Sequence, residues 1–164
     1  MRILKGLAVA VTVVVVAALA AGRLGLLQGQ APSDLGVRNG QLKAPSTTPN
    51  SVSSQAAMLA NHPRRVEAQI APLHYQGDGA VAFARLAELV AGTDGARVVK
   101  SEPGYLYATY TTPILRFVDD VEFWLDPAGS VVQVRSASRI GHGDWGVNRA
   151  RIEALRARFE GQPS

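Results

Sequence analysis

Apolar and polar residues alternate over four segments in the second half of the chain, the pattern of strands with one buried face. Turn-forming residues separate the segments, including Glu-Pro-Gly before Tyr105 and Asp-Pro-Ala-Gly after Leu125. A shorter alternation before Pro72 predicts one further strand, which ends there or lies at a sheet edge. The expected strands are residues 66–71, 96–100, 105–111, 117–125 and 131–138.

Two segments show helical spacing instead. Asp78 can cap a helix that runs to about residue 91, with an apolar stripe of Phe83, Leu86 and Val90 and with Gly92 after its end. A last helix is expected from residue 144 to about residue 160. The resulting order, β-α-β-β-β-β-α, predicts an α+β fold in which an antiparallel sheet carries two helices on one face.

The N-terminus has the pattern of an exported or anchored protein. Arg2 and Lys5 precede residues 6–22, which carry no charge and would form roughly 26 Å of helix, close to the hydrocarbon thickness of a bilayer. This helix is interpreted as an uncleaved signal anchor, and Ala18-Leu-Ala also allows a signal peptide that is removed. The first alternative gives a single-pass protein of the cell membrane with a periplasmic C-terminal domain, and the second gives a secreted protein.

Between this leader and the first strand the composition changes to Gly, Pro, Ser, Thr, Asn and Gln. Pro32, Pro45, Pro49 and Pro63 interrupt any regular period, so the segment is predicted to be an extended linker. Within it, residues 51–60 are able to form a short helical turn that packs on the domain. The expected organisation is a leader over residues 1–27, a linker over 28–62 and a globular domain over 63–161.

The strands on either side of Asp126 form the one hairpin whose register can be argued. A type I turn over Asp-Pro-Ala-Gly would place Asp126 opposite Gly129 and Phe123 opposite Val132, apolar against apolar. The same register places Asp120 opposite Arg135 on the outer face of the sheet, where ion pairs on a solvated surface are expected.

On the face toward the core, this register puts polar groups where apolar ones are expected. Asp119 would lie opposite Ser136, with Ser138 two residues further on. One face of the last helix carries Trp145, Asn148, Ile152, Leu155 and Phe159. Because this face packs on the core, Asn148 should also point at the sheet. Two interpretations stay open, a buried polar network that fixes the docking of the helix, with Asp144 as its N-cap, and a ligand pocket.

Charge and composition exclude several classes of function. Without Arg2 and Lys5 the net charge falls from +4 to +2, and the absence of a basic cluster argues against nucleic-acid binding. The chain has no cysteine, and His62, His74 and His142 lack metal-ligand spacing, so no metal site is expected. Glycine-rich phosphate motifs are absent, so no cofactor is expected either.

Three motifs resemble the domain of unknown function 1499 family (DUF1499). They are Phe117-Val-Asp-Asp-Val-Glu-Phe, Val134-Arg-Ser-Ala-Ser-Arg-Ile-Gly and Asp144-Trp-Gly-Val-Asn-Arg-Ala-Arg-Ile-Glu. Upstream, Leu35-Gly-Val and Pro49-Asn-Ser-Val-Ser-Ser-Gln extend the resemblance to residues 35–159. It implies a single small domain of bacterial envelopes or plastids, behind a signal or anchor, with no established activity. Members often have cysteines where Ser51 stands and close to Pro45.

The expected function is therefore that of a non-enzymatic domain at the membrane that binds a small molecule, a lipid or a protein partner. The alternative is a hydrolase in which Asp119 or Asp144 acts as general base, which would require a cavity open to solvent. The candidate binding residues are Asp119, Arg135, Ser136, Ser138, Arg139, Asp144, Asn148 and Arg149.

Overall fold

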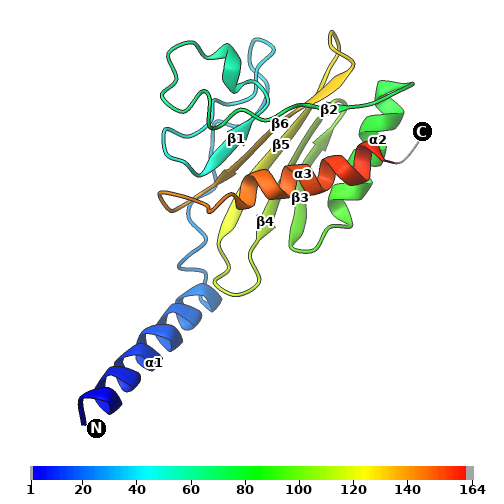
Figure 1. The fold of residues 1–164 in the computed structure, drawn as a ribbon. Coiled ribbons are helices and arrows are strands. Elements are labelled where there is room, and N and C mark those ends of the chain that lie inside the picture. The colour runs from blue at the N-terminus through cyan, green and yellow to red at the C-terminus, as the bar shows by residue number, and fades with distance from the viewer. Residues whose placement is uncertain (1, 162–164) are drawn as a thin grey trace.

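The computed structural model describes residues 2–161 and has the predicted α+β architecture. A long helix, α1, leads into a six-stranded antiparallel sheet that carries α2 and α3 on one face (Figure 1). The helices are α1 (Arg2–Arg23), the 3-10 turn η1 (Ala56–Met58), α2 (Gly79–Ala91) and α3 (Val147–Glu160). The strands are β1 (Ser51–Ser53), β2 (Leu73–His74), β3 (Ala96–Glu102), β4 (Tyr105–Thr111), β5 (Val118–Asp126) and β6 (Val131–Ser138).

The sheet has the order β1-β6-β5-β4-β3, and β2 joins β1 along the outer edge of β6. The predicted meander of four long strands and the helix capped by Asp78 are confirmed, the Asp78 carboxylate accepting the N–H groups of Ala80 and Val81. Helix α1 is long and apolar enough to cross a membrane and buries almost none of its surface against the domain. This fits either a signal anchor or a signal peptide.

The predicted strand over residues 66–71 is wrong. Ala68 donates its N–H to the carbonyl of Arg64, and Gln69 donates to Val66, so the chain coils through successive turns there. Val66 is exposed, and only a single bridge from Gln69 to Ser53 reaches the sheet. The short strand that fills this place in the order is β2, one residue after Pro72.

The register of the β5–β6 hairpin differs from the prediction by two residues. Asp126 pairs with Val131 instead of Gly129, so the loop is 127–130 and ends at Ser130, whose φ is 51°. The predicted turn ended at Gly129, one residue before this left-handed position. Because the shift is even, each side chain stays on its predicted face and only its partner changes. Phe123 lies opposite Val134, and Asp119 opposite Ser138.

The core lies between the sheet and the two helices. It combines Phe83 and Leu86 of α2, Phe123 of β5, and Ile152 and Phe159 of α3, each at most 6% exposed. The prediction that Trp145 belongs to this face is wrong, because α3 begins at Val147 and Trp145 is 101% exposed in the preceding loop. Asn148, by contrast, is completely buried as predicted.

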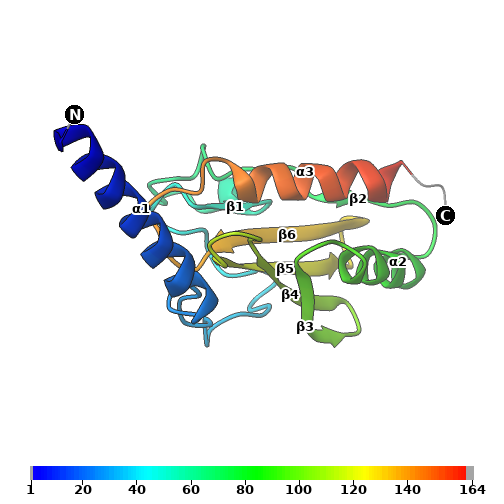
Figure 2. The same ribbon diagram turned by 90° about the horizontal axis from the view of Figure 1, so that it is seen from below.

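The other face of the sheet is also covered, by the segment predicted as a linker. Figure 2 shows α3 on one side of the sheet, and the chain that follows α1 begins on the opposite side. Leu42 is buried and donates its N–H to the Gln55 side chain, and Gly36 donates its N–H to Glu122 on β5. Ala56 in η1 is fully buried, which confirms the predicted turn packed on the domain. Strands β5 and β6 are therefore buried on both faces over most of their length.

Candidate functional site

Beneath α3, a buried polar network joins the helix to the sheet. The Arg151 guanidinium donates to Asp119 Oδ2 at 2.5 Å, to Asn148 Oδ1 at 2.7 Å and to the Ser136 hydroxyl at 3.0 Å. Ser136 in turn donates to Asn148 Oδ1 at 2.5 Å. Asp119, Ser136 and Asn148 are at most 3% exposed. The predicted convergence of these side chains between helix and sheet is confirmed.

The same network reaches the start of α3 and the edge strand. The Asn148 amide donates to the Ser138 hydroxyl, to Asp144 Oδ2 and to the carbonyl of Asn50. Asp144 also accepts the N–H groups of Gly146 and Asn148, so it holds the first turn although the N-cap position itself is Gly146. Among residues 2–161, none of these side chains has a buried polar atom without a hydrogen-bond partner, which is the arrangement of a structural network.

A second buried ionic cluster lies on the opposite face, under the segment after α1. Glu122 is fully buried and accepts hydrogen bonds from the Tyr105 hydroxyl and from the N–H of Gly36, both at 2.8 Å. Arg135 is its counter-ion, with Nη1 3.6 Å from Glu122 Oε2, and also donates to the carbonyl of Ala44. Burial lowers the pKa of Arg135, and Glu122 opposes this effect. The prediction of solvated ion pairs on this face is therefore wrong.

Next to it, Asp120 and Arg139 form a forked ion pair. Arg139 Nε and Nη2 both donate to the Asp120 carboxylate at 2.8–3.1 Å, and Nη2 also donates to the Tyr107 hydroxyl. Tyr107 donates to Asp120 at 2.5 Å. The bonds to Asp120 raise the pKa of Arg139. Burial, with this hydrogen bond and the charge of Asp120, raises the pKa of Tyr107 to about 12, and burial also raises the pKa of Tyr105.

The raised pKa of Tyr107 gives a pH dependence of stability. The folded state keeps this proton at a pH where the unfolded chain, with a tyrosine pKa of about 10, has lost it, so the free energy of unfolding should fall as pH rises from about 10 to 12. We expect Tyr107→Phe to make this decline shallower, measured as urea denaturation at several alkaline pH values. An unchanged pH slope in the variant would contradict the prediction. Some decline of the free energy of unfolding with pH should remain in the variant, because the pKa of Tyr105 is raised as well.

Beside the Asp120–Arg139 pair, a groove of about 630 Å³ opens between the segment after α1 and strands β3 and β4. We call it the arginine groove, because Arg97, Arg116 and Arg139 line it. Arg97 and Arg116 are exposed and have no ion pair or side-chain hydrogen bond among residues 2–161, and no carboxylate lines the groove. The rest of its lining is Gln28, Ala31, Pro32, Gly95, Ala96, Val99, Tyr107, Thr109, Thr111 and Val118.

The structure separates the predicted site residues into three places. Asp119, Ser136, Ser138, Asp144 and Asn148 lie beneath or at the start of α3. Arg135 and Arg139 lie on the other face of the sheet, and only Arg139 lines the arginine groove. Arg149 donates to the carbonyls of Glu67 and Gln69, and it lines a pocket of about 200 Å³ together with Asp144. The eight residues do not form one site.

Several important residues were missed by sequence reasoning. Arg151 is three residues after Asn148, a spacing that placed it near the same helix face. Asn50 fixes β6 and the loop after it through its carbonyl and side chain. It belongs to a motif of the family resemblance, but its place in the proline-rich segment gave no indication of these contacts. Arg97 and Arg116 become neighbours only through the β3–β4 pairing and the loop between β4 and β5.

The geometry gives the hydrolase alternative no supporting feature. The Asp119 carboxylate is bound by Arg151, so a general base there would first have to lose that partner. Both Asp144 oxygens accept hydrogen bonds from the start of α3. Within residues 2–161, no three His, Asp or Glu side chains gather as a metal site.

The comparison with protein families finds one family over most of the domain. The family model described as "Protein of unknown function (DUF1499)" matches residues 41–159, which include every strand, α2 and nearly all of α3. The Leu35-Gly-Val motif lies outside the matched range. No curated protein and no solved structure matches the chain. With a match over well more than half of its length, the chain belongs to the DUF1499 family.

Proposed function

We propose that this domain is a non-enzymatic envelope protein, tethered by α1, that binds an anionic amphiphile such as a membrane lipid in the arginine groove. The observation that carries the proposal is the pair of unpartnered arginines, Arg97 and Arg116, in a groove whose described lining has no acidic side chain. Guanidinium groups bind phosphates with paired, charge-assisted hydrogen bonds.

The rest of the groove suits the remainder of such a ligand. Val99, Val118 and Pro32 offer apolar surface, and Thr109 and Thr111 offer hydroxyls beside the arginines. The described lining contains no Asp, Glu, His, Ser or Cys, the residue types that most often provide the nucleophile or general base of a hydrolase, which supports binding over catalysis.

The position of the groove also fits a ligand that comes from the bilayer. Gln28 and Pro32, which line it, follow directly after α1, and Arg116 is next to Leu115, against which the last turn of α1 packs. If α1 spans the membrane, the groove opens close to the lipid headgroups.

The test is native mass spectrometry of the full chain, released from detergent with phosphatidylglycerol or with phosphatidylcholine. We expect phosphatidylglycerol adducts to dominate, and Arg97→Glu with Arg116→Glu to reduce them at least about tenfold, because each charge-assisted bond contributes about 1.5–3 kcal/mol. Arg38→Glu with Arg65→Glu is the matched control, since it changes net charge equally at exposed positions outside the groove. Inorganic phosphate and glycerol phosphate, added as competitors, distinguish a headgroup site from one that needs the acyl chains.

Equal adducts of the two lipids would overturn the proposal, as would an equal loss of adducts in the control pair. If inorganic phosphate alone displaced the lipid adducts, the arginine groove would be a simple phosphate site and not a lipid site.

A further inference from the structure

We propose that the end of the domain where α1 joins it, here called the anchor-side end, inserts into the lipid interface through Trp145, Ile114, Leu24 and Leu26. The anchor-side end consists of residues 24–27, the loop 112–117 between β4 and β5, and the loop 139–146 between β6 and α3. The inference rests on α1 spanning the bilayer and goes beyond the ligand groove. It assigns a lipid-contacting surface to the folded domain itself.

The apolar side chains at this end are unusually exposed. Trp145 is 101% exposed, Leu24 75%, Leu26 72% and Ile114 67%. Single exposed apolar residues are normal on any protein, and Met58 and Val81 are examples here. A group of them at one end, including a fully exposed tryptophan, indicates a surface that contacts something.

The contacts of the three segments place them around the base of the anchor. Gly22, in the last turn of α1, packs so closely on Leu115 that an added Cβ would lie 2.6 Å from the Leu115 carbonyl oxygen. Gly29, shortly after α1, is similarly close to Ile140 and Arg139 in the other loop. Val147, next to that loop, shares a cavity wall with Pro113. The loop 112–117 and the first residues of the loop 139–146 therefore lie beside the end of α1 and the chain that follows it.

The backbone conformation of its loop holds Trp145 in an exposed position. Asp144 accepts the N–H groups of Gly146 and Asn148, which fixes the backbone on both sides of Trp145. Trp145 itself has φ of 55°, a left-handed conformation that is unfavourable for a residue other than glycine. The fold thus keeps the indole ring exposed although the backbone conformation of Trp145 is unfavourable.

The chemistry of this end matches a bilayer surface. Tryptophan is enriched at the membrane–water interface, where its ring contacts lipid and its N–H remains hydrated. Arg23 and Arg116 are exposed beside the apolar residues and are suited to lipid phosphates. The two turns at the opposite end of the sheet, residues 103–104 and 127–130, contain only Pro, Gly, Ala and Ser. The asymmetry along the strands favours the bilayer as the occupant of the anchor-side end.

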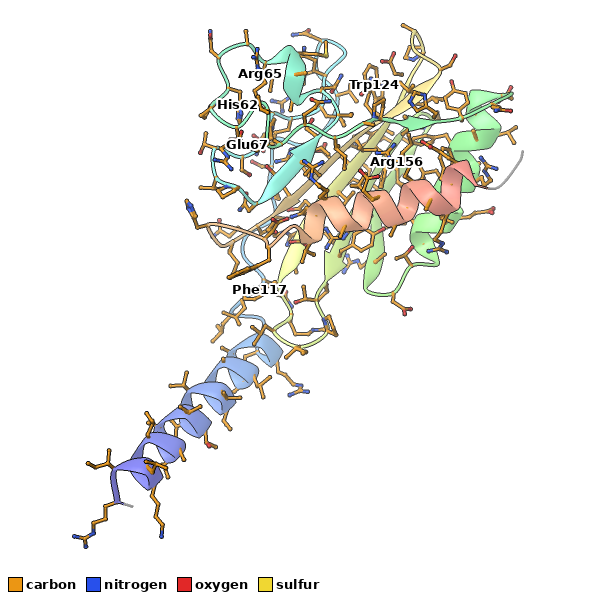
Figure 3. All side chains as sticks on the ribbon, viewed as in Figure 1. His62, Arg65, Glu67, Phe117, Trp124 and Arg156 are labelled. Carbon is orange, nitrogen blue, oxygen red and sulfur yellow. The ribbon has the colours of Figure 1, made fainter. Side chains whose placement is uncertain are left out.

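The chain provides its own control, because its two tryptophans lie at opposite ends of the domain. Trp124 is near the far end of β5, about 20 Å along the strand from Val118. Figure 3 shows Trp124 far from α1 and Phe117, at the start of β5, close to it. Variant Trp124→Phe leaves Trp145 as the only tryptophan, and Trp145→Phe leaves Trp124.

The experiment uses the full chain reconstituted in vesicles that contain phospholipids brominated on their acyl chains. We expect Trp145 in the Trp124→Phe variant to lose most of its emission to the brominated lipids and to be protected from aqueous iodide. Trp124 in the Trp145→Phe variant should be unaffected by the brominated lipids. Adding Ile114→Glu to the first variant should reduce the bromine quenching, since the charge would lift the loop out of the interface.

An iodide-accessible Trp145 that brominated lipids do not quench would overturn the proposal. Quenching of both tryptophans alike would also overturn it, because it would indicate that the domain lies on its side or is unfolded. Trp145 does not line the arginine groove, so this result and the lipid adducts in mass spectrometry can fail independently.

Discussion

Replacing Arg151 with leucine is expected to lower the free energy of unfolding by about 3–5 kcal/mol, because the change leaves the buried Asp119 carboxylate without its cation. Arg151 also donates to Asn148 and Ser136, so the loss extends to the contact between α3 and β6. Urea denaturation of the full chain in detergent, followed by tryptophan fluorescence, measures the effect.

Arg158→Leu is the matched control on the same helix. Arg158 is exposed and makes one 3.2 Å hydrogen bond to Thr93, so its loss should change stability by no more than about 0.5 kcal/mol. The double variant Asp119→Leu with Arg151→Leu removes both charges and should recover much of the lost stability. If Arg151→Leu cost no more than Arg158→Leu, the ionic network would not be what joins the helix to the sheet.

On the other face of the sheet, Arg135→Met is expected to lower the free energy of unfolding by a similar amount, about 3–5 kcal/mol. It removes the counter-ion of Glu122, whose carboxylate is fully buried and would keep only its bonds to Tyr105 and Gly36. The same denaturation experiment applies. Because the cluster lies under the segment 28–50, that segment should also become more sensitive to limited proteolysis.

Lys100→Met gives the comparison for an exposed ion pair. Lys100 and Glu102 are 3.0 Å apart, with side chains that are about half exposed, and such pairs contribute about 0–1 kcal/mol. Combining Arg135→Met with Glu122→Gln should restore part of the lost stability. An Arg135→Met variant as stable as Lys100→Met would show that Glu122 does not need its cation.

The sequence was sufficient to predict the parts of the fold that depend on one element at a time. Strand β4, the helix capped by Asp78 and the burial of Asn148 each follow from local spacing. The register of the β5–β6 hairpin does not, because it depends on whether Ser130 adopts a left-handed conformation, which its residue type does not require.

The second ionic cluster could not be predicted for a different reason. Asp120 and Glu122 alternate with apolar residues, which is also the pattern of a solvated strand face. What buries them is a segment without any periodicity, whose contacts include the N–H of Gly36 and the carbonyl of Ala44. Contacts made by backbone groups cannot be predicted from the residue types, because every residue has a backbone carbonyl. The arginine groove was missed because the same segment forms one of its walls.

If α1 is an uncleaved signal anchor, the packing of residues 28–50 on the sheet limits how far the domain can move from it. A flexible segment of this length could extend on the order of 75 Å, which would let the domain move well away from the end of α1. The hydrogen bonds of Gly36, Leu42 and Ala44 instead hold the segment against the domain. Under the proposed function, a lipid would then pass from the membrane into the arginine groove without crossing open water.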